Sequence, residues 1–145
     1  MHKKQNFFVQ DFESVNEQDY LKRKNIPHIF HTFKWMRIIK ETLNVNCKIA
    51  LLKENNIIVA SIPFVSYRNL IKGQCALPLQ FSGYYGSIFA DKEDLKIKIF
   101  SKFLEYCKNF NFFTQIPEVN SINGYQFFSG YSIYKIKLKD SSSAE

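Results

Sequence analysis

The segment from residue 83 to residue 86 holds the side chains best suited to binding a ligand. Its sequence is Gly83-Tyr84-Tyr85-Gly86, so two tyrosines stand between two glycines. Glycine lets a ligand approach the backbone closely, and tyrosine offers both an aromatic ring and a hydroxyl group. We therefore expect this segment to line a binding groove. The alternative is that both tyrosines pack normally and leave their polar ends in water.

A second candidate site lies at the only tryptophan, Trp35, which follows Lys34. Lysine also alternates with other residues in Tyr134-Lys135-Ile136-Lys137. Basic residues interleaved with aromatic ones are typical of a non-catalytic module that binds an anionic partner such as RNA or a nucleotide sugar. Alternating lysines also occur on the solvated face of an antiparallel sheet. Trp35 in turn fits the apolar stripe of a helix, so a core position is the alternative for it.

Several chemistries are excluded by what the sequence lacks. His28 and His31 have metal-ligand spacing, but no third ligand accompanies them, so we expect no metal site. The sequence contains no Ser-His-Asp set, P-loop or G-x-G-x-x-G fingerprint, which removes the hydrolase, kinase and dehydrogenase interpretations. The three cysteines (Cys47, Cys75 and Cys107) are far apart and lack CxxC spacing. They are expected to be core thiols in a reducing cytoplasm.

Length and composition indicate one packed domain. The chain has 145 residues, of which 46% are hydrophobic and 23% are charged, so a normal core is expected. The net charge is +7, but only three residues are arginine (Arg23, Arg37 and Arg68), which weakens a nucleic-acid interpretation. The longest apolar run, Ile57 to Val65, is too short to cross a bilayer. With no hydrophobic signal segment, we expect a cytoplasmic protein.

Three helices are expected to position these residues. Ser14-Val15-Asn16-Glu17 reads as a capping box, and the helix it opens should end before Pro27. A second helix should begin at Thr32, and a third should be capped by Asp91. Their apolar stripes are Trp35, Met36, Ile39 and Leu43 in the second helix, and Leu95, Ile99, Phe100, Phe103, Leu104 and Cys107 in the third.

The strand pattern lies mainly between the second and third helices. Lys48 to Lys53 and Ile57 to Ser66 are β-prone runs joined by Glu54-Asn55-Asn56, which predicts a tight hairpin. Pro63 lacks an N–H group, so we expect a bulge or a local break in pairing there. Further strands are expected at Ile71 to Leu77, Phe112 to Ile116 and Ser132 to Leu138. The order predicts an α+β fold with a mixed, mostly antiparallel sheet flanked by helices.

This order of elements is similar to that of GNAT-fold acyltransferases, and certain motifs resemble the FemAB-like families more narrowly. A Phe-His-Thr-x-x-Trp sequence opens the second helix, and the strand after it resembles the family's "I-V-G-x-L-P-L" strand. A glycine, an "L-P-F" step and a "Y-G-G" or "R-G-P" turn then follow in the family's order. These motifs are Phe30-His31-Thr32-x-x-Trp35, Ile57-Ile58-Val59-Ala60-Ser61-Ile62-Pro63-Phe64, Gly73, Leu77-Pro78-Leu79 and Tyr85-Gly86-Ser87, with Asp91 close behind.

The resemblance implies a bacterial aminoacyl- or N-acyltransferase of cell-envelope assembly, acting on peptidoglycan or polysaccharide. Acetyl-coenzyme A or aminoacyl-tRNA would be the acyl donor, and a nucleotide sugar or peptidoglycan precursor the substrate. It implies a substrate groove formed by Lys34, Trp35, Gly83, Tyr84, Tyr85 and Gly86. Gln80-x-x-Gly83-x-Tyr85 is a degenerate form of the GNAT pyrophosphate loop. The alternative for that loop is a turn between strand and helix.

The match covers only the first of the two GNAT-like halves of such enzymes. We therefore expect residues 1–140 to form one GNAT-like domain followed by a polar tail, residues 141–145. The isolated half should be inactive and should associate with a second half or with itself. No carboxylate is singled out by spacing as a general base. The residues expected in the core are Trp35, Ile39, Leu51, Val59, Ile62, Leu95, Ile99, Phe103 and Leu104.

Overall fold

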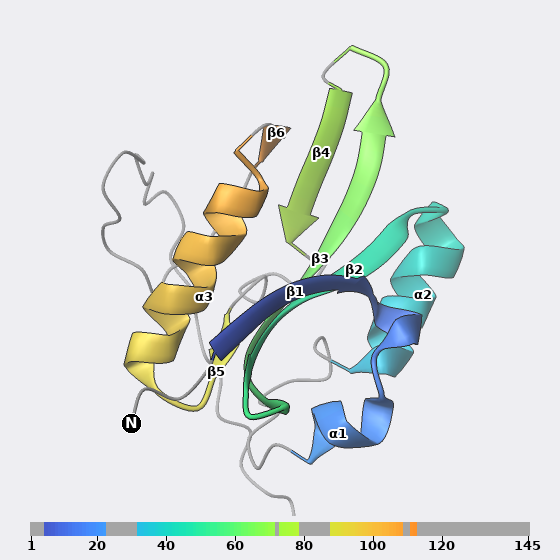
Figure 1. Ribbon diagram of the computed structural model, residues 1–145. Coiled ribbons are helices and arrows are strands. Elements are labelled where there is room, and N and C mark those ends of the chain that lie inside the picture. The colour runs from blue at the N-terminus through green and yellow to red at the C-terminus, as the bar shows by residue number, and fades with distance from the viewer. Residues whose placement is uncertain (1–4, 23–31, 72, 79–87, 109–110, 113–145) are drawn as a thin grey trace, which may run out of the picture.

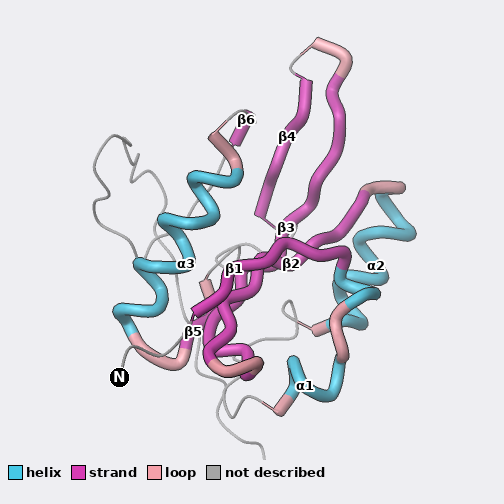
Figure 2. The backbone as a smooth tube through the Cα atoms, viewed as in Figure 1, coloured by secondary structure: helices cyan, strands magenta, loops and turns pink. Residues whose placement is uncertain are grey.

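The computed structural model describes residues 5–22, 32–71, 73–78, 88–108 and 111–112, which form one curled sheet with helices on both sides (Figures 1 and 2). The elements follow one another in an α+β pattern. In chain order they are β1 (Gln5–Asp11), the 3-10 helix η1 (Phe12–Ser14), α1 (Glu17–Leu21), α2 (Phe33–Leu43), β2 (Asn46–Glu54), β3 (Ile57–Asn69), β4 (Gly73–Pro78), β5 (Phe89–Ala90), α3 (Glu93–Tyr106) and β6 (Asn111–Phe112).

The sheet is mixed and mostly antiparallel, which confirms the predicted α+β architecture with helices flanking such a sheet. Its strand order is β1-β2-β3-β4-β6. The short strand β5 also pairs with β3 but is not part of this order. All pairs from β1 to β4 are antiparallel, whereas β4 and β6 are parallel. A parallel pair needs a crossover connection. In this chain α3 lies within that crossover, between β5 and β6.

The two faces of the sheet carry separate apolar clusters, because side chains alternate along a strand. On β2, Ile49 and Leu51 pack with η1, α1 and α2, whereas Ala50 and Leu52 pack with α3. Figure 1 accordingly shows α3 on one side of the sheet and α1 and α2 on the other. Any site on α2 is therefore separated from α3 by the sheet.

The hairpin between β2 and β3 turns where the sequence predicts it. Asn55 and Asn56 have φ values of 49° and 67°, a left-handed conformation that asparagine tolerates better than most residues. The register then shifts, since Lys53 pairs with Ile58 but Leu52 pairs with Ala60, which leaves Val59 as the extra residue of a bulge.

Pro63 does not form the expected bulge, because Ile49 pairs with it in a regular register. On the other side of β3, no described residue pairs with Pro63, and residues 79–87, which lead from β4 towards β5, lie outside the described residues. On that side, the pairing with β5 ends at Ser61 and the pairing with β4 begins at Phe64. Proline cannot donate to a ladder, so it lies where the described ladder is interrupted.

Helix α2 begins as predicted, with Thr32 as its N-cap. The Thr32 hydroxyl accepts a hydrogen bond from the Trp35 N–H at 3.3 Å. The helix ends at Asn44, whose φ of 50° is again left-handed. Met36 and Ile39 of the predicted stripe are buried, whereas Trp35 and Leu43 are only partly buried.

The other two caps differ from the sequence predictions. Asn16, not Ser14, caps α1, and its side chain accepts from the Asp19 N–H at 3.0 Å. Both are good cap residues, and the chain first completes the 3-10 turn that contains Ser14. Asp91 does not cap α3, because Lys92 takes the N-cap position and the Asp91 N–H donates to the Val59 carbonyl.

The core is largely the predicted one. All of the residues expected there are buried except Trp35, which is partly buried. All six residues of the predicted α3 stripe are also buried. Strand β1 was not expected from the sequence. Of the expected C-terminal strands, only Asn111–Phe112 is described as β6, and residues 113–116 and 132–138 lie outside the described residues, as does the tail.

Candidate functional site

Two of the predicted site residues, Lys34 and Trp35, lie in the first turn of α2. Lys34 is exposed, whereas Trp35 is partly buried at the edge of the cluster beneath α2, with its indole Nε1 atom buried. Thr32 fixes the start of this turn, so the lysine and the ring are presented from a defined helix end. The structure therefore places these two residues together at the surface, where they could contact a ligand.

The other predicted site residues, Gly83, Tyr84, Tyr85 and Gly86, lie outside the described residues. Their place in the chain is still informative, because residues 79–87 join the end of β4 to Ile88, next to β5. Ile88 is buried in the cluster under α3, whereas Trp35 belongs to the cluster under α2. The predicted groove that combines these four residues with Lys34 and Trp35 therefore stays a prediction.

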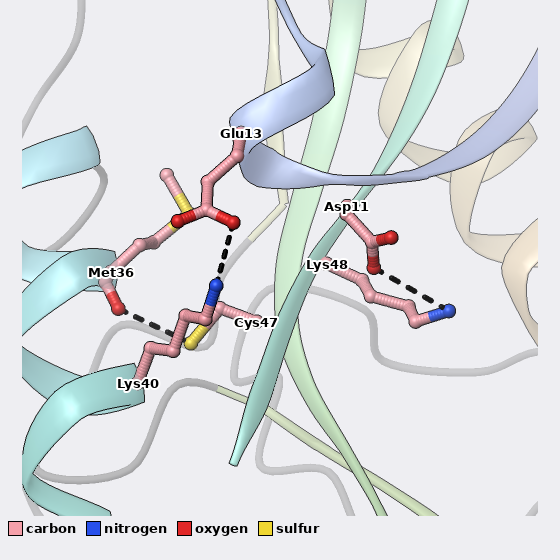
Figure 3. Close-up of polar contacts among 6 residues, drawn as sticks. All are labelled: Asp11, Glu13, Met36, Lys40, Cys47 and Lys48. Atoms are coloured by element: carbon pink, nitrogen blue, oxygen red, sulfur yellow. Dashed lines mark hydrogen bonds and ion pairs between the residues drawn. The ribbon is translucent and has the colours of Figure 1, made fainter. Parts of the chain in front are cut away.

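A polar pocket that the sequence analysis missed lies where η1, α2 and β2 meet (Figure 3). It has a volume of about 230 Å³ and is lined by Asp11, Glu13, Lys40, Asn46, Cys47 and Lys48. The Lys40 ammonium donates to Glu13 at 2.6 Å and lies 5.8 Å from the centre of the Phe12 ring. Lys48 and Asp11 form a looser ion pair at 3.7 Å. Each lysine is thus paired with one carboxylate, and the four charges sum to zero.

Cys47 sits at the base of this pocket but is not suited to act as a nucleophile. Its thiol donates to the Met36 carbonyl at 3.3 Å. Burial raises the pKa of Cys47 to about 11; nearby Lys40 opposes this rise, and Glu13 adds to it. A thiol reacts as the thiolate, so at neutral pH Cys47 is inert. Burial likewise raises the pKa of Cys107 to about 12. The prediction that the cysteines are core residues is confirmed.

The geometry of the pocket indicates a structural role. The two ion pairs join η1 and the end of β1 to α2 and β2, and each carboxylate is more than half exposed. Exposed pairs of this kind contribute about 0–1 kcal/mol each. Glu13 and Lys40 are 27 positions apart, so no local sequence pattern could have predicted their contact.

A second, shallower groove runs between β1 and α3. It has a volume of about 680 Å³ and is lined by Gln5, Asn6, Phe7, Phe8, Lys102, Glu105 and Tyr106. Gln5 donates an amide hydrogen bond to Glu54 across the β1–β2 pair. The Gln5 Oε1 atom is buried and has no hydrogen-bond partner among the described residues.

The described part of the chain was searched for metal sites and for membrane-spanning helices. It contains no group of three or more His, Cys, Asp or Glu residues that could hold a metal ion, and His28 and His31 lie outside it. Among the helices described, none is long and apolar enough to span a membrane. Comparisons of the chain with protein-family models, curated proteins and solved structures found no match.

Proposed function

We propose that this chain is a GNAT-like half of a FemAB-like aminoacyl- or N-acyltransferase of bacterial cell-envelope assembly. The observation that carries the proposal is the crossover from β4 to its parallel neighbour β6. Ligands of sheets with parallel strands bind beyond the carboxyl ends of those strands. The segment that leaves that end of β4 contains Gly83-Tyr84-Tyr85-Gly86, the glycine-flanked tyrosines of the proposed groove.

The order of the elements gives further support. Two helices precede the antiparallel strands β2, β3 and β4, and α3 then leads to the parallel strand β6. That is the order on which the resemblance to GNAT-fold acyltransferases rests. Strand β1 extends this sheet at its other end without changing the order.

Of the two acyl donors, we favour aminoacyl-tRNA over acetyl-coenzyme A. The first turn of α3 carries Glu93 and Asp94, and its N-cap residue Lys92 makes no side-chain cap. A helix N-terminus attracts phosphate through free N–H groups and a positive dipole end, but two carboxylates there repel a diphosphate. The α3 terminus therefore does not fit the diphosphate of coenzyme A. The net charge of +7 favours a polyanionic donor.

For the acceptor, we propose that Lys34 and Trp35 bind a nucleotide-linked peptidoglycan precursor. Lys34 would supply a charge for the diphosphate, and the partly buried Trp35 would supply a stacking surface. In this proposal, Tyr84 and Tyr85 of the segment that follows β4 add ring and hydroxyl contacts to the same precursor.

We expect the chain alone to give no turnover. Both carboxylates of the polar pocket, Asp11 and Glu13, are paired with lysines, so neither is offered as a general base. Transferases gain rate by holding donor and acceptor in one cleft, so a partner that completes the cleft is required. We place this reaction in the cytoplasm, where nucleotide-linked precursors and aminoacyl-tRNA are made.

The acceptor site can be tested through the fluorescence of Trp35, because this is the only tryptophan in the chain. A nucleotide-linked peptidoglycan precursor should quench its emission. Lys34→Ala should weaken the binding at least fivefold, since the phosphate loses its cation. The matched control is Lys98→Ala, which removes an exposed lysine from α3 on the other side of the sheet. Absence of quenching, or equal weakening by both variants, would contradict the proposed acceptor site.

The alternative function is a non-catalytic module that binds an anionic partner, and the exposed Lys34 beside Trp35 favours it. The two functions are distinguished by assays with aminoacyl-tRNA, acetyl-coenzyme A and an amine-bearing precursor. Acyl transfer to the precursor, by this chain or with an added partner, favours the enzyme. RNA binding that falls steeply with salt, without transfer from either donor, favours the module.

A further inference from the structure

Strand β1 is the end strand of the described sheet, so no described strand pairs with its outer backbone edge. Among the described strands it pairs only with β2. Figure 1 shows it running along the outside of the curled sheet. The N–H and C=O groups on the outer side of an edge strand form a template for another strand. This edge is therefore a surface on which a further strand can be added.

Strand β1 lacks most of the features that protect an edge strand, and its one charged residue, Asp11, is the last residue of the strand. Its sequence, QNFFVQD, contains no lysine, arginine, proline or glycine, and its register with β2 is continuous. Natural edge strands are blocked by lysine, proline, bulges or short length. All seven residues of β1 pair with β2 in one continuous register, and the middle residue, Phe8, is 41% exposed. An edge of this kind pairs readily.

The groove between β1 and α3 adds a binding surface beside the open edge. Lys102, Glu105 and Tyr106 have the spacing that places residues on one face of a helix, and they line the groove opposite Phe7 and Phe8. A strand added to β1 would lay its side chains over this groove. The buried and unpartnered Gln5 Oε1 atom would offer an acceptor at one end of it.

We propose that β1 pairs antiparallel with β1 of a second copy of this chain, with Phe8 on the two-fold axis. In an antiparallel pair, two opposed residues either both direct their N–H and C=O groups at the partner strand or both direct them away. These two kinds of residue alternate along each strand, so a residue cannot lie opposite its own sequence neighbour in a second copy. A two-fold axis must therefore pass through a residue position. Only Phe8, the middle of Gln5–Asp11, allows all seven residues to pair.

The side chains of β1 suit a second copy of the same strand. In this register Phe7 lies opposite Val9, Asn6 lies opposite Gln10, and the two Phe8 residues face each other. Asp11 is the only charged residue in the strand, and it lies opposite Gln5, so the paired residues of the two β1 strands bring no like charges together; Lys53 of β2 lies over the Phe8 ring at 5.7 Å. The groove carries one residue of each sign, Lys102 and Glu105, so it does not repel its own copy. This inference is independent of the proposed function.

The first experiment measures association of the full chain by sedimentation velocity over a range of concentrations. We expect a dimer that dissociates on dilution. Phe8→Lys places a charge at the centre of the pair and should weaken dimerisation at least tenfold. The matched control is Ile38→Lys, on α2, where the side chain is 42% exposed. A monomer at every concentration, or equal dimerisation of the two variants, would overturn the proposal.

The second experiment tests the register and does not depend on the stability of the lysine variant. Opposed Cα atoms of an antiparallel pair lie about 4.5–5.5 Å apart, which is within the Cα separation of disulfide-linked cysteines. Phe8→Cys should therefore give a covalent dimer on mild oxidation. Asn6→Cys, on the same face, should not, because the two copies of residue 6 are about 13 Å apart along the strand. The native cysteines are buried and do not interfere. Equal crosslinking of both variants, or of neither, would overturn the proposal.

Discussion

Cys47 and Cys107 have the two most strongly perturbed thiol pKa values, and they make the stability of the fold depend on pH in the alkaline range. Burial raises the pKa of Cys47 to about 11 and that of Cys107 to about 12, whereas an unfolded chain loses thiol protons near a pKa of about 8.5. Above the unfolded pKa the unfolded state releases protons that the folded state retains. The free energy of unfolding therefore falls as pH rises, by at most about 1.4 kcal/mol per pH unit for each thiol.

Urea titrations at pH 8, 9 and 10 test this dependence. The wild-type chain should lose stability over this range, and Cys107→Ala should lose less because one thiol no longer titrates. The cavity left by the substitution lowers stability at every pH and does not alter the slope. The same slope in both proteins would contradict the assignment of the pH dependence to the buried thiols.

At the scale of elements, the β2–β3 hairpin depends on the left-handed conformation of its two turn residues. Asn56 has a φ of 67°. Glycine adopts this conformation without a Cβ penalty, so Asn56→Gly should stabilise the fold by a few tenths of a kcal/mol. Asn56→Val should destabilise it by about 1–2 kcal/mol. Chemical denaturation measures both changes.

Asn6 provides the control for the glycine substitution, because it lies in β1 and has no positive φ. There Asn6→Gly should cost about 0.5–1 kcal/mol, since glycine loses more backbone entropy on folding. The sign of the effect should thus reverse between two asparagines of the same chain. If both glycine variants are destabilised equally, the turn conformation is not the cause.

The elements that the sequence predicted have strong local signals. The apolar stripe of α3, the cap at Thr32 and the asparagine turn each arise within a few residues. Strand β1 has no such signal, because Phe7, Phe8 and Val9 are consecutive rather than alternating and its pairing partner lies about 40 positions away. The predictions of Ser14 and Asp91 as helix caps were wrong. The N-cap of α1 is Asn16, two residues after Ser14, and the N-cap of α3 is Lys92, one residue after Asp91.

The candidate site was predicted less completely than the fold, for a physical reason. The presence of Lys34 and Trp35 on one helix turn follows from their adjacency in sequence. The pocket formed by Glu13, Lys40 and Cys47 depends on where η1 and α2 dock on the sheet, which no local pattern records. Ion pairs between exposed groups are weak, so they leave no compositional signal either.

At the scale of the whole molecule, the sheet separates two apolar clusters that should respond independently to substitution. Ile39 belongs to the cluster with α2, and Ile99 belongs to the cluster with α3. Ile39→Val and Ile99→Val should each cost about 0.5–1.5 kcal/mol. Their effects should add within about 0.5 kcal/mol in the double variant, because the two sites share no cluster.

A pair within one cluster gives the comparison. Ile99 and Phe103 are one turn apart on α3, and both are fully buried in the same cluster. Ile99→Val combined with Phe103→Leu should depart from additivity by more than about 0.5 kcal/mol, since the two cavities can merge or relax together. If the pair on opposite faces shows the larger coupling, the sheet transmits packing changes between the clusters.

The order of β1 and β2 along the chain also matters while the protein is being made. β1 is synthesised before its partner strand, and because Gln5 pairs with Glu54, that partner is complete only 49 residues later. At about 5–20 residues per second, this takes roughly 2–10 seconds. During that interval the unprotected sequence QNFFVQD has no strand of its own chain to pair with. On crowded polysomes, the neighbouring nascent chains then present the same sequence.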